Sequence, residues 1–260
     1  MDEYGLLIAG IEDRKRQCEE RYMISNTAFL DLKQRSDAES YVKKLKMSDY
    51  VFWGGYPGAE RCVLVFLPDY IQISSDSADI FEEYEEDNPL AVIRADYSGR
   101  SRELSHRDYL GSLMALGIKR ECIGDILVNK TGADIIVLRE ICEFLLLNYG
   151  KAGNTYLNIE KTDFSQLRIP EFRIREKSDT VASLRLDNVI SSAFSVSRSA
   201  ASDSIKAGLV FVNSIQTEKT DFTVKQGDVL VFRGKGKAVL SEVGGKSRKD
   251  RLYIKTGIYE

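Results

Sequence analysis

The stretch RLDNVISSAFSVSRSAASDSIKAGLVFVN, residues 185–213, decides the fold of the last part of this chain. Apolar side chains recur every three or four residues over 186–194, which predicts a one-sided amphipathic helix. Ser195 or Ser197 can cap a second helix over residues 198–206. The stretch therefore predicts two short helices in succession, followed by a strand of β-branched and aromatic residues.

Two features of the second helix point beyond its fold. Gly208 stands where a left-handed residue ends a helix, and the strand LVFVN follows it directly. At roughly 100° per residue, Arg198 and Lys206 lie about 80° apart around the helix, so they can share one outer face. Two cations on one face can bind the same phosphate backbone as point charges.

The charge of the chain is divided unevenly along its 260 residues, although the net charge is only −3. Residues from Thr180 onward hold 13 Lys and Arg against 8 Asp and Glu, a net charge of +5, and residues 1–179 hold 24 against 32, a net charge of −8. Such asymmetry indicates a module that binds nucleic acid on an otherwise acidic body.

Three segments divide the chain. Residues 90–160 read in the order β-α-β-β-α-β, the split pattern of ferredoxin-like folds and RNA-recognition motifs, but the strand ADIIVL lacks the aromatics that stack bases there. We therefore expect an α+β, multi-domain protein. Its expected domains are a helical and hairpin N-terminal domain, 1–75; an RNA-recognition-motif-like domain, 76–178; and a C-terminal αα-β RNA-binding domain, 179–260.

Local signals inside these segments give further expectations. Residues 11–47 read as helices with breaks near Ser25 and Ser36, and two strands flank the loop GGYPG. The acidic residues 76–89 read as a solvated face or a linker, and residues 161–182 as an edge strand or a linker. The aromatic side chains of Trp53, Tyr56 and Tyr97 are expected in the core rather than stacked on bases.

A resemblance to known proteins rests on several motifs together. Arg185-Leu186-Asp187, Ser197-Arg198-Ser199, Lys206, Gly208, Asn213, Gly227 and Asp228 resemble the RNA-binding domain named after small-subunit ribosomal protein S-four, with Ser214 where many members have Gly. The motifs FWGGYPGAER and LSHRDYLGSLMALGIKRECIGDILV are similar to those of the YlmH family of bacterial RNA-binding proteins, and this resemblance spans essentially the whole chain.

The resemblance implies a non-enzymatic role on the large ribosomal subunit, in rescue of stalled subunits that still carry tRNA, and genes in a cell-division cluster. The expected partners are rRNA or tRNA on the large ribosomal subunit. We expect a monomeric cytoplasmic protein that binds no membrane, no cofactor and no small-molecule substrate. The expected RNA-binding residues are Arg185, Ser197, Arg198, Ser199, Lys206, Asn213, Arg233, Lys235, Lys237, Lys246, Arg248, Lys249 and Arg251. Secondary contacts are expected at His106, Arg107, Lys119 and Arg120.

Two single motifs indicate other possible functions. GGKS at residues 244–247 lacks the earlier Gly of a phosphate-binding loop and precedes a strand, so a basic RNA-binding loop is the preferred interpretation. Arg185-Leu186-Asp187 resembles the catalytic triplet of pseudouridine synthases, which leaves an RNA-modifying enzyme as an alternative. A cell-division-linked adaptor that uses the acidic segment is another.

The remaining chemistry-bearing residues give weak signals. His106 can act as a general base, but it has no nucleophile at a telling spacing, so a capping or surface role is preferred. Four scattered cysteines and one histidine predict reduced thiols in the cytoplasm and no zinc site. The sequence contains no run of 18 apolar residues, so it predicts no membrane-spanning helix.

Overall fold

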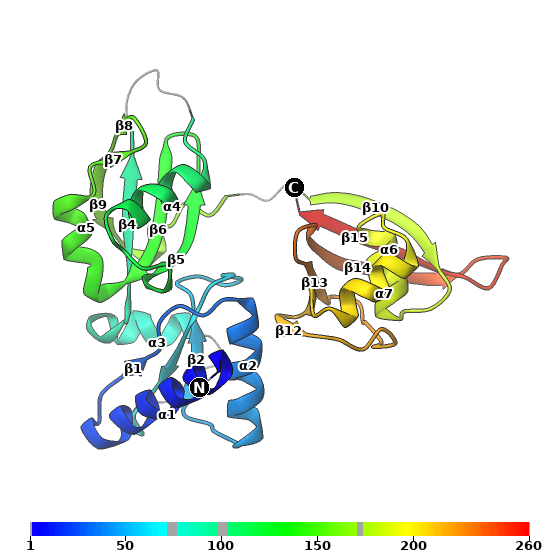
Figure 1. Cartoon of the computed structure of the whole chain (residues 1–260), viewed down its shortest axis with the longest axis horizontal. Helices are drawn as coiled ribbons and strands as arrows, with labels where there is room; N and C mark the ends of the chain where they lie inside the picture. The colour runs from blue at the N-terminus through cyan, green and yellow to red at the C-terminus, as the bar shows by residue number, and fades with distance from the viewer. Residues whose placement is uncertain (1, 72–76, 98–102, 171–173, 260) are drawn as a thin grey trace. The chain divides into compact units, whose positions relative to one another are not determined.

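The protein folds into two compact units, Met1–Pro170 and Glu171–Glu260 (Figure 1). This computed structural model describes residues 2–71, 77–97, 103–170 and 174–259. Both units mix helices and antiparallel strands, which confirms the expected α+β class with several domains. The division into domains 1–75, 76–178 and 179–260 stays a proposal.

The first part of unit 1 places two helices against a three-stranded sheet of order β1-β3-β2. Its elements are α1 (Glu3–Arg21), β1 (Ser25–Asn26), α2 (Leu32–Lys44), β2 (Tyr50–Trp53) and β3 (Val63–Phe66). β2 and β3 pair antiparallel, as the loop GGYPG predicts. The four residues of β3 are all buried because both of its faces are covered: Leu64 and Phe66 face α1 and α2, while Val63 and Val65 face a second cluster.

The expected helix break near Ser36 is wrong. Asp31 begins α2 with a capping box, in which Asp31 Oδ1 accepts from the Gln34 amide at 2.9 Å and Gln34 Oε1 accepts from the Asp31 amide at 2.9 Å. Ser36 lies inside this helix and is buried. The helix therefore begins at the Asp31 cap, five residues before Ser36, and continues without a break through Ser36.

The second part of unit 1 follows the predicted order β-α-β-β-α-β, with a small hairpin inserted before the last strand. Its main strands form an antiparallel sheet of order β5-β6-β4-β9, and the ferredoxin-like class itself stays a prediction. The elements are β4 (Leu90–Asp96), α4 (His106–Ala115), β5 (Ile123–Val128), β6 (Gly132–Leu138), α5 (Cys142–Asn148), β7 (Lys151–Ala152), β8 (Thr155–Tyr156) and β9 (Asn158–Thr162).

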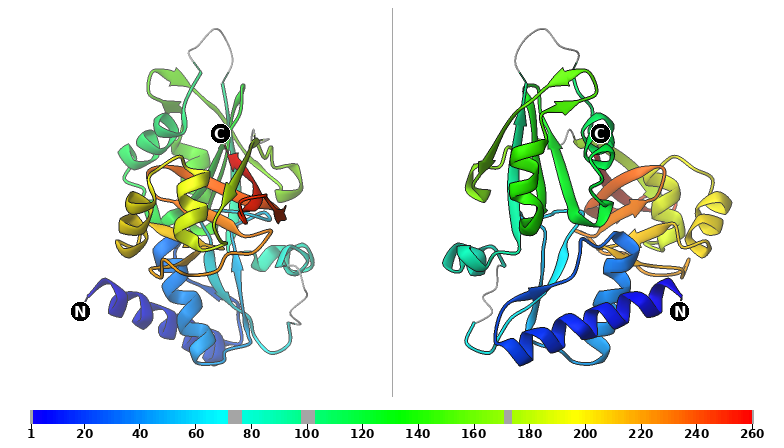
Figure 2. Two further views of the ribbon diagram at one scale, coloured as in Figure 1. Left: turned by 90° about the vertical axis from the view of Figure 1, so that its right-hand side faces the viewer. Right: turned by 60° about the vertical axis from the view of Figure 1, so that its left-hand side comes forward.

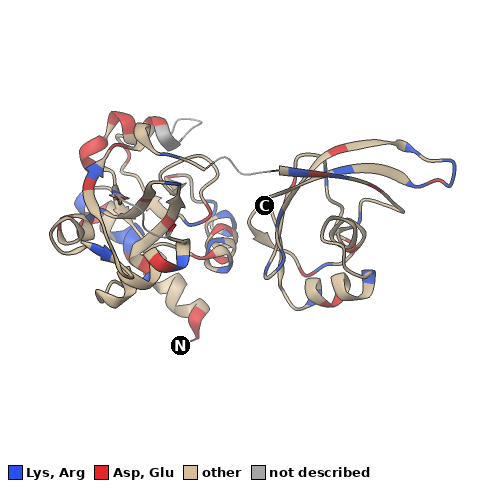
Figure 3. Cartoon of the chain, turned by 90° about the horizontal axis from the view of Figure 1, so that it is seen from above, with Lys and Arg blue, Asp and Glu red and all other residues tan. Residues whose placement is uncertain are grey.

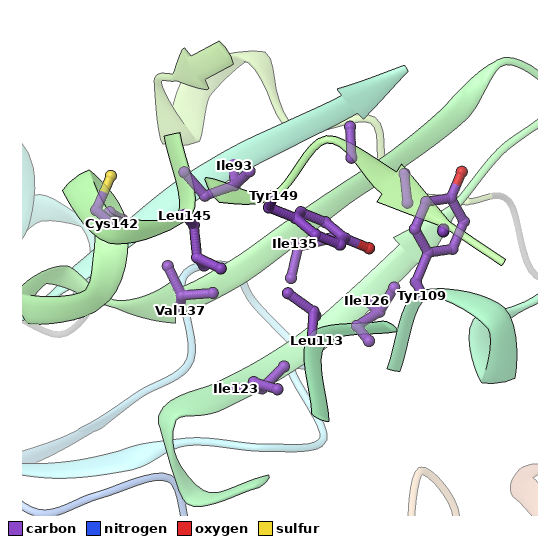
Figure 4. Close-up of a cluster of buried hydrophobic side chains, with 14 of the residues drawn as sticks. Ile93, Tyr109, Leu113, Ile123, Ile126, Ile135, Val137, Cys142, Leu145 and Tyr149 are labelled. Atoms are coloured by element: carbon purple, nitrogen blue, oxygen red, sulfur yellow. The ribbon is translucent and has the colours of Figure 1, made fainter. Parts of the chain in front are cut away.

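One face of this sheet packs under α4 and α5 (Figure 2). Alternate residues of β6 point into that core, where Ile135 and Val137 meet Leu113 of α4 and Leu145 of α5 (Figure 4). Tyr149, just after α5, closes the cluster with a buried ring.

Part of the opposite face of the sheet is covered by the first part of the unit. Ile136 and Leu138 of β6 belong to the same buried cluster as Trp53 and Val65 from the first sheet. Hydrogen bonds join the two parts as well: Asp125 accepts from Tyr56 Oη at 2.8 Å and from the amides of Glu60 and Arg61 at 2.8 and 3.1 Å. Unit 1 therefore holds both parts as one compact body.

Within the acidic segment 76–89, whose residue 76 lies outside the described ranges, residues 77–89 are not a linker. Residues Ser77–Glu83 form α3, whose Ile80 and Phe81 are buried, and a 3₁₀ turn follows at Glu85–Asp87. The Phe81 ring stacks on Trp53 at 5.1 Å between centroids. The interpretation as a solvated face holds only for the acidic side chains, since two apolar residues among them anchor the helix.

A charged cluster lies beside this core. Asp134 of β6 is fully buried and accepts hydrogen bonds from Arg94 Nε at 3.0 Å and from Arg168 Nη2 at 2.6 Å. Arg168 also donates to Asp96 at 2.8 Å. Burial alone would raise the pKa of Asp134, but the two arginines outweigh it and hold the pKa below its ordinary value.

Unit 2 is a six-stranded sheet of order β10-β15-β14-β13-β11-β12 with two helices packed on it. The elements are β10 (Ile174–Val181), α6 (Leu186–Ala193), α7 (Arg198–Lys206), β11 (Val210–Val212), β12 (Ile215–Gln216), β13 (Val229–Phe232), β14 (Gly236–Lys246) and β15 (Leu252–Tyr259). β10 is the expected edge strand and pairs with β15 over its full length, so the proposed domain boundary at 178/179 lies inside a strand.

Candidate RNA interface

The two helices of unit 2 form where the sequence predicted them. Ser197 caps α7 by accepting from the Ala200 amide at 3.1 Å, and Gly208 has a φ of 70°. Ala201 and Ile205 of α7 are buried with Val189 and Ile190 of α6. This packing leaves Arg198, Ser199 and Lys206 exposed.

A buried carboxylate joins two of the predicted RNA-binding arginines. Arg185 donates to Asp187 from Nε and Nη2, both at 3.2 Å, and Arg198 donates to Asp187 Oδ2 at 3.1 and 3.0 Å. The Asp187 side chain is only 6% exposed, whereas Arg185 and Arg198 are 39% and 57% exposed. Burial would raise the pKa of Asp187, but the two arginines keep the pKa below its ordinary value.

The contacts of Asp187 indicate two roles for the Arg185-Leu186-Asp187 motif. Asp187 lies in the first turn of α6, as expected of an acid that the helix dipole favours. It also fixes the positions of two guanidinium groups that face solvent. One carboxylate against two arginines leaves a positive local charge in a held geometry, which is an arrangement suited to phosphate oxygens.

Arg198 also lines a polar groove of about 390 Å³ between β10 and α6. Lys177 and Arg251 line the same groove. Lys177 Nζ donates to the Ser192 carbonyl and, at 2.7 Å, to Ser195 Oγ, so it also holds the end of α6. The sequence did not identify Lys177 as a candidate site residue, because residues 161–182 read as an edge strand or linker. Only the pairing of β10 with β15 brings Lys177 to α6.

A second group of cations lies at the tip of the β14–β15 hairpin (Figure 3). Arg248 and Lys249 are exposed there, and Lys246 forms an ion pair with Asp250 at 2.7 Å. Ser247 organises the turn, since its amide donates to the Arg251 carbonyl at 2.7 Å. Residues 244–246 are strand and a strand follows, so the GGKS motif does not form a phosphate-binding loop.

A third group lies at the other end of β14. Arg233 Cζ lies 5.1 Å from the centroid of the Phe211 ring, and Lys237 Nζ lies 5.1 Å from the centroid of the Tyr259 ring. Lys235 is exposed in the turn between Arg233 and Lys237. From residue 237 to residue 246, β14 spans about 30 Å at 3.3 Å per residue. The third group is therefore well separated from the second, and the expected residues do not form one patch.

Asn213 has a structural role in the turn after β11. Its Nδ2 donates to Asp228 at 2.8 Å and its Oδ1 accepts from the Val229 amide at 2.9 Å. Asn213 and Ser214 both have positive φ, 51° and 69°. Ser214 therefore keeps the left-handed conformation that a Gly adopts more easily, and the turn is preserved.

The secondary residues in unit 1 have different surroundings. Ser105, not His106, caps α4. Desolvation by the surrounding protein, together with the charge of Arg120, lowers the pKa of His106. Arg120 donates to the carbonyls of Ile123 and Gly124, and burial lowers its pKa to about 10. Lys119 forms an exposed ion pair with Glu121 at 3.7 Å, while Arg107 lines a groove beside α4.

The described residues also bear on metal, disulfide and membrane sites. Within the described ranges, no group of three or more His, Cys, Asp or Glu side chains is placed to hold a metal ion. The four cysteines are free thiols, and Cys18, Cys62 and Cys142 are buried. In the same ranges, no helix is long and apolar enough to cross a membrane. Trp53 and Tyr56 are core residues, as expected.

Comparison with known proteins follows the order of these parts. Residues 8–71 match the family "YlmH, N-terminal", residues 84–166 match "Putative RNA-binding domain in YlmH", and residues 184–230 match the S4 domain. The chain is 33% identical over 240 residues to "Ribosome-associated protein quality control protein P2" of Bacillus subtilis (strain 168), covering 92% of this chain and 89% of that protein. The chain belongs to the YlmH family.

This YlmH-family chain also matches a solved structure, "Cell division protein ylmH from Streptococcus pneumoniae". The two are 21% identical, with a TM-score of 0.49 over 65% of this chain and 96% of the other. The S4 match covers α6, α7 and the strands up to β13, and therefore includes Asp187 with its two arginines. The hairpin β14–β15 lies beyond that match.

Proposed function

We propose that this YlmH-family protein binds RNA on the large ribosomal subunit or on ribosomal complexes that carry tRNA, without catalysing a reaction. In this proposal it acts as a monomer in the cytoplasm, in quality control of stalled translation. It is a homologue of a ribosome-associated quality control protein and contains an S4 domain. The observation that carries the proposal is the pair of solvent-facing arginines that Asp187 holds in that domain.

The charges of unit 2 support RNA rather than a protein as its main partner. Exposed cations of unit 2 lie around Asp187, at the tip of the β14–β15 hairpin and in the turn before β14, while unit 1 holds most of the acids. Contacts to phosphates supply affinity and orientation irrespective of sequence, and they suit a protein that docks on folded RNA.

The geometry of Asp187 argues against the pseudouridine synthase alternative. A catalytic carboxylate must reach the base that it attacks, but this one is 6% exposed and is occupied by two arginines. Its contacts instead hold α6, Arg185 and Arg198 together. We therefore assign the triplet Arg185-Leu186-Asp187 a positioning role in binding.

Sedimentation of the full chain with ribosomal particles tests the proposal. Tagged protein should travel with the large subunit on a sucrose gradient, and RNA crosslinked to it in cells should map to that subunit's rRNA or to tRNA. The double variant Arg248→Glu, Lys249→Glu should lose this association. Lys219→Glu, Lys225→Glu, the same charge change on exposed lysines of unit 2, should keep it. Wild-type protein found only free of ribosomal particles contradicts the proposal.

A separate measurement addresses catalysis. Deletion of the gene should leave every pseudouridine and methyl group of rRNA and tRNA in place. A modification that disappears on deletion and returns only with the wild-type gene would show that the protein is an enzyme.

A further inference from the structure

The second part of unit 1 does not offer the open, aromatic sheet face on which RNA-recognition motifs bind. RNA-recognition motifs stack bases on an open sheet face. Here one face packs under α4 and α5, while the other is covered in part by Trp53, Val65 and their neighbours and carries the charged cluster of Arg94, Asp134 and Arg168 beside them. An added Cβ at Gly55 would lie 3.0 Å from Ile136, which shows how closely the first part covers the sheet. Strands β4, β5, β6 and β9 carry no aromatic side chain, so a base stacked on this part of unit 1 must lie elsewhere.

An open groove of about 830 Å³ runs along the outer side of α4. Small residues of the helix, Gly111, Ser112 and Ala115, line one side, and the chain from Asn148 to Tyr156 lines the other. The base of the groove is firm, because Tyr149 is buried in the core and its Oη lies 2.9 Å from Ser112 Oγ. The helix and the β7–β8 hairpin thus form the two sides of the groove.

The groove carries an exposed aromatic ring with cations around it. Tyr156 is 78% exposed, and Lys151 Nζ lies 5.2 Å from the centroid of its ring. Arg107 lies exposed on the α4 side. Among the described residues that line the groove, Asp108 is the one acid. It accepts hydrogen bonds from the Ser105 amide and hydroxyl at 2.8 and 2.7 Å, which ties it to the helix cap.

We propose that this groove binds an unpaired RNA strand, with one base stacked on Tyr156 and the backbone phosphates against Lys151 and Arg107. An aromatic face offers every base a stacking surface, and neighbouring cations follow the backbone, which together are the features of single-strand binding. The inference rests on the proposed RNA-binding function and gives the middle domain a contact of its own, on the helical side of its sheet.

Crosslinking locates the RNA on the full chain. The probe is a short unpaired RNA oligonucleotide that carries 4-thiouridine, and the crosslinked peptides are identified by mass spectrometry. We expect crosslinks on the peptide that contains Tyr156, in addition to those in unit 2. If the full chain binds no RNA, the proposed function fails. If RNA binds and crosslinks appear only in unit 2, the function stands and this inference is overturned.

Variants then test each contact through the affinity for the same probe. Tyr156→Ala should weaken binding about tenfold, the size expected for loss of one stacked base, and Tyr156→Phe should keep most of the affinity. Tyr4→Ala removes an exposed tyrosine elsewhere in unit 1 and should have no effect. Replacing Arg107 and Lys151 by Ala should lower the salt slope of binding by about 0.7 for each lost phosphate contact. Unchanged affinity and slope in these variants would leave the groove to a protein partner instead.

Discussion

At the scale of the residue, Asp187 connects the stability of unit 2 to its binding surface. Its carboxylate is buried and accepts four hydrogen bonds from Arg185 and Arg198. We expect Asp187→Asn to destabilise unit 2 by about 2 kcal/mol, because hydrogen bonds between charged groups contribute about 1.5–3 kcal/mol. Hydrogen exchange of the α6 and β11 amides in the full chain measures this change. Unchanged protection of those amides would mean that the arginines contribute little to the fold.

The pH dependence of this effect has a definite sign. The pKa of Asp187 is depressed in the folded protein, so its contribution to stability is complete above the ordinary value of 3.8. The contribution is lost as the pH falls through the lower folded value. The difference in protection between wild type and Asp187→Asn should therefore be largest near pH 7 and shrink below about pH 4. Glu3→Gln, which changes an exposed acid of α1, should show no such trend.

The role of Arg198 shows what a residue pattern can and cannot predict. The cap at Ser197 and the left-handed Gly208 depend on a few neighbouring residues, and the sequence predicted both. The pairing of Arg198 with Asp187 depends on how α7 packs against α6. The sequence therefore predicted Arg198 as an independent point charge, and its partner became visible only in the folded unit.

At the scale of the element, the β14–β15 hairpin carries the cations that are easiest to test for RNA contact. Arg248 and Lys249 lie exposed at its tip, so their loss should not affect the fold. Replacing both by Ala should lower the slope of log K against log salt for single-stranded RNA by about 1.4, or about 0.7 for each contact. The melting temperature should stay unchanged. Lys219→Ala, Lys225→Ala provides the matched control, and an equal loss of slope in that control would show that only total charge matters.

The edge strand β10 sets the limits of the C-terminal unit. It pairs with β15 from Ile174 to Val181, and Lys177 and Asp179 hydrogen-bond to α6 through Ser192. A fragment of residues 171–260 should therefore be more stable than one of 180–260 by about 2 kcal/mol or more, at about 1 kcal/mol for each lost hydrogen bond. Urea unfolding of the two fragments measures the difference. Equal stability would show that β10 is dispensable.

Element types were easier to predict than their surroundings. The order β-α-β-β-α-β follows from periodicity and turn residues, which are local signals. The acidic segment 76–89 was misread because its composition outweighs Ile80 and Phe81, the two residues that pack in the core. The groove beside Tyr156 was not predicted, since it exists only where α4 meets the β7–β8 hairpin.

At the scale of the whole molecule, the two units carry opposite net charges: unit 1 is acidic and unit 2 is basic. Residues up to 179 carry a net charge of −8, and the rest carry +5. An acidic unit is repelled by phosphates, so RNA affinity should depend mainly on unit 2, and unit 1 should add a local contact where its cations line the groove.

This division predicts how affinity responds to salt in the separated units. The fragment 171–260 should bind structured ribosomal RNA with most of the full chain's affinity, and at low salt it should bind more tightly because the acidic unit is gone. The two curves should converge as salt rises, since screening removes the long-range repulsion first. Filter binding over a salt series checks this, with the fragment 1–170 as the complementary control. Tight binding by 1–170 and none by 171–260 would place the main RNA surface on unit 1 and overturn the assignment.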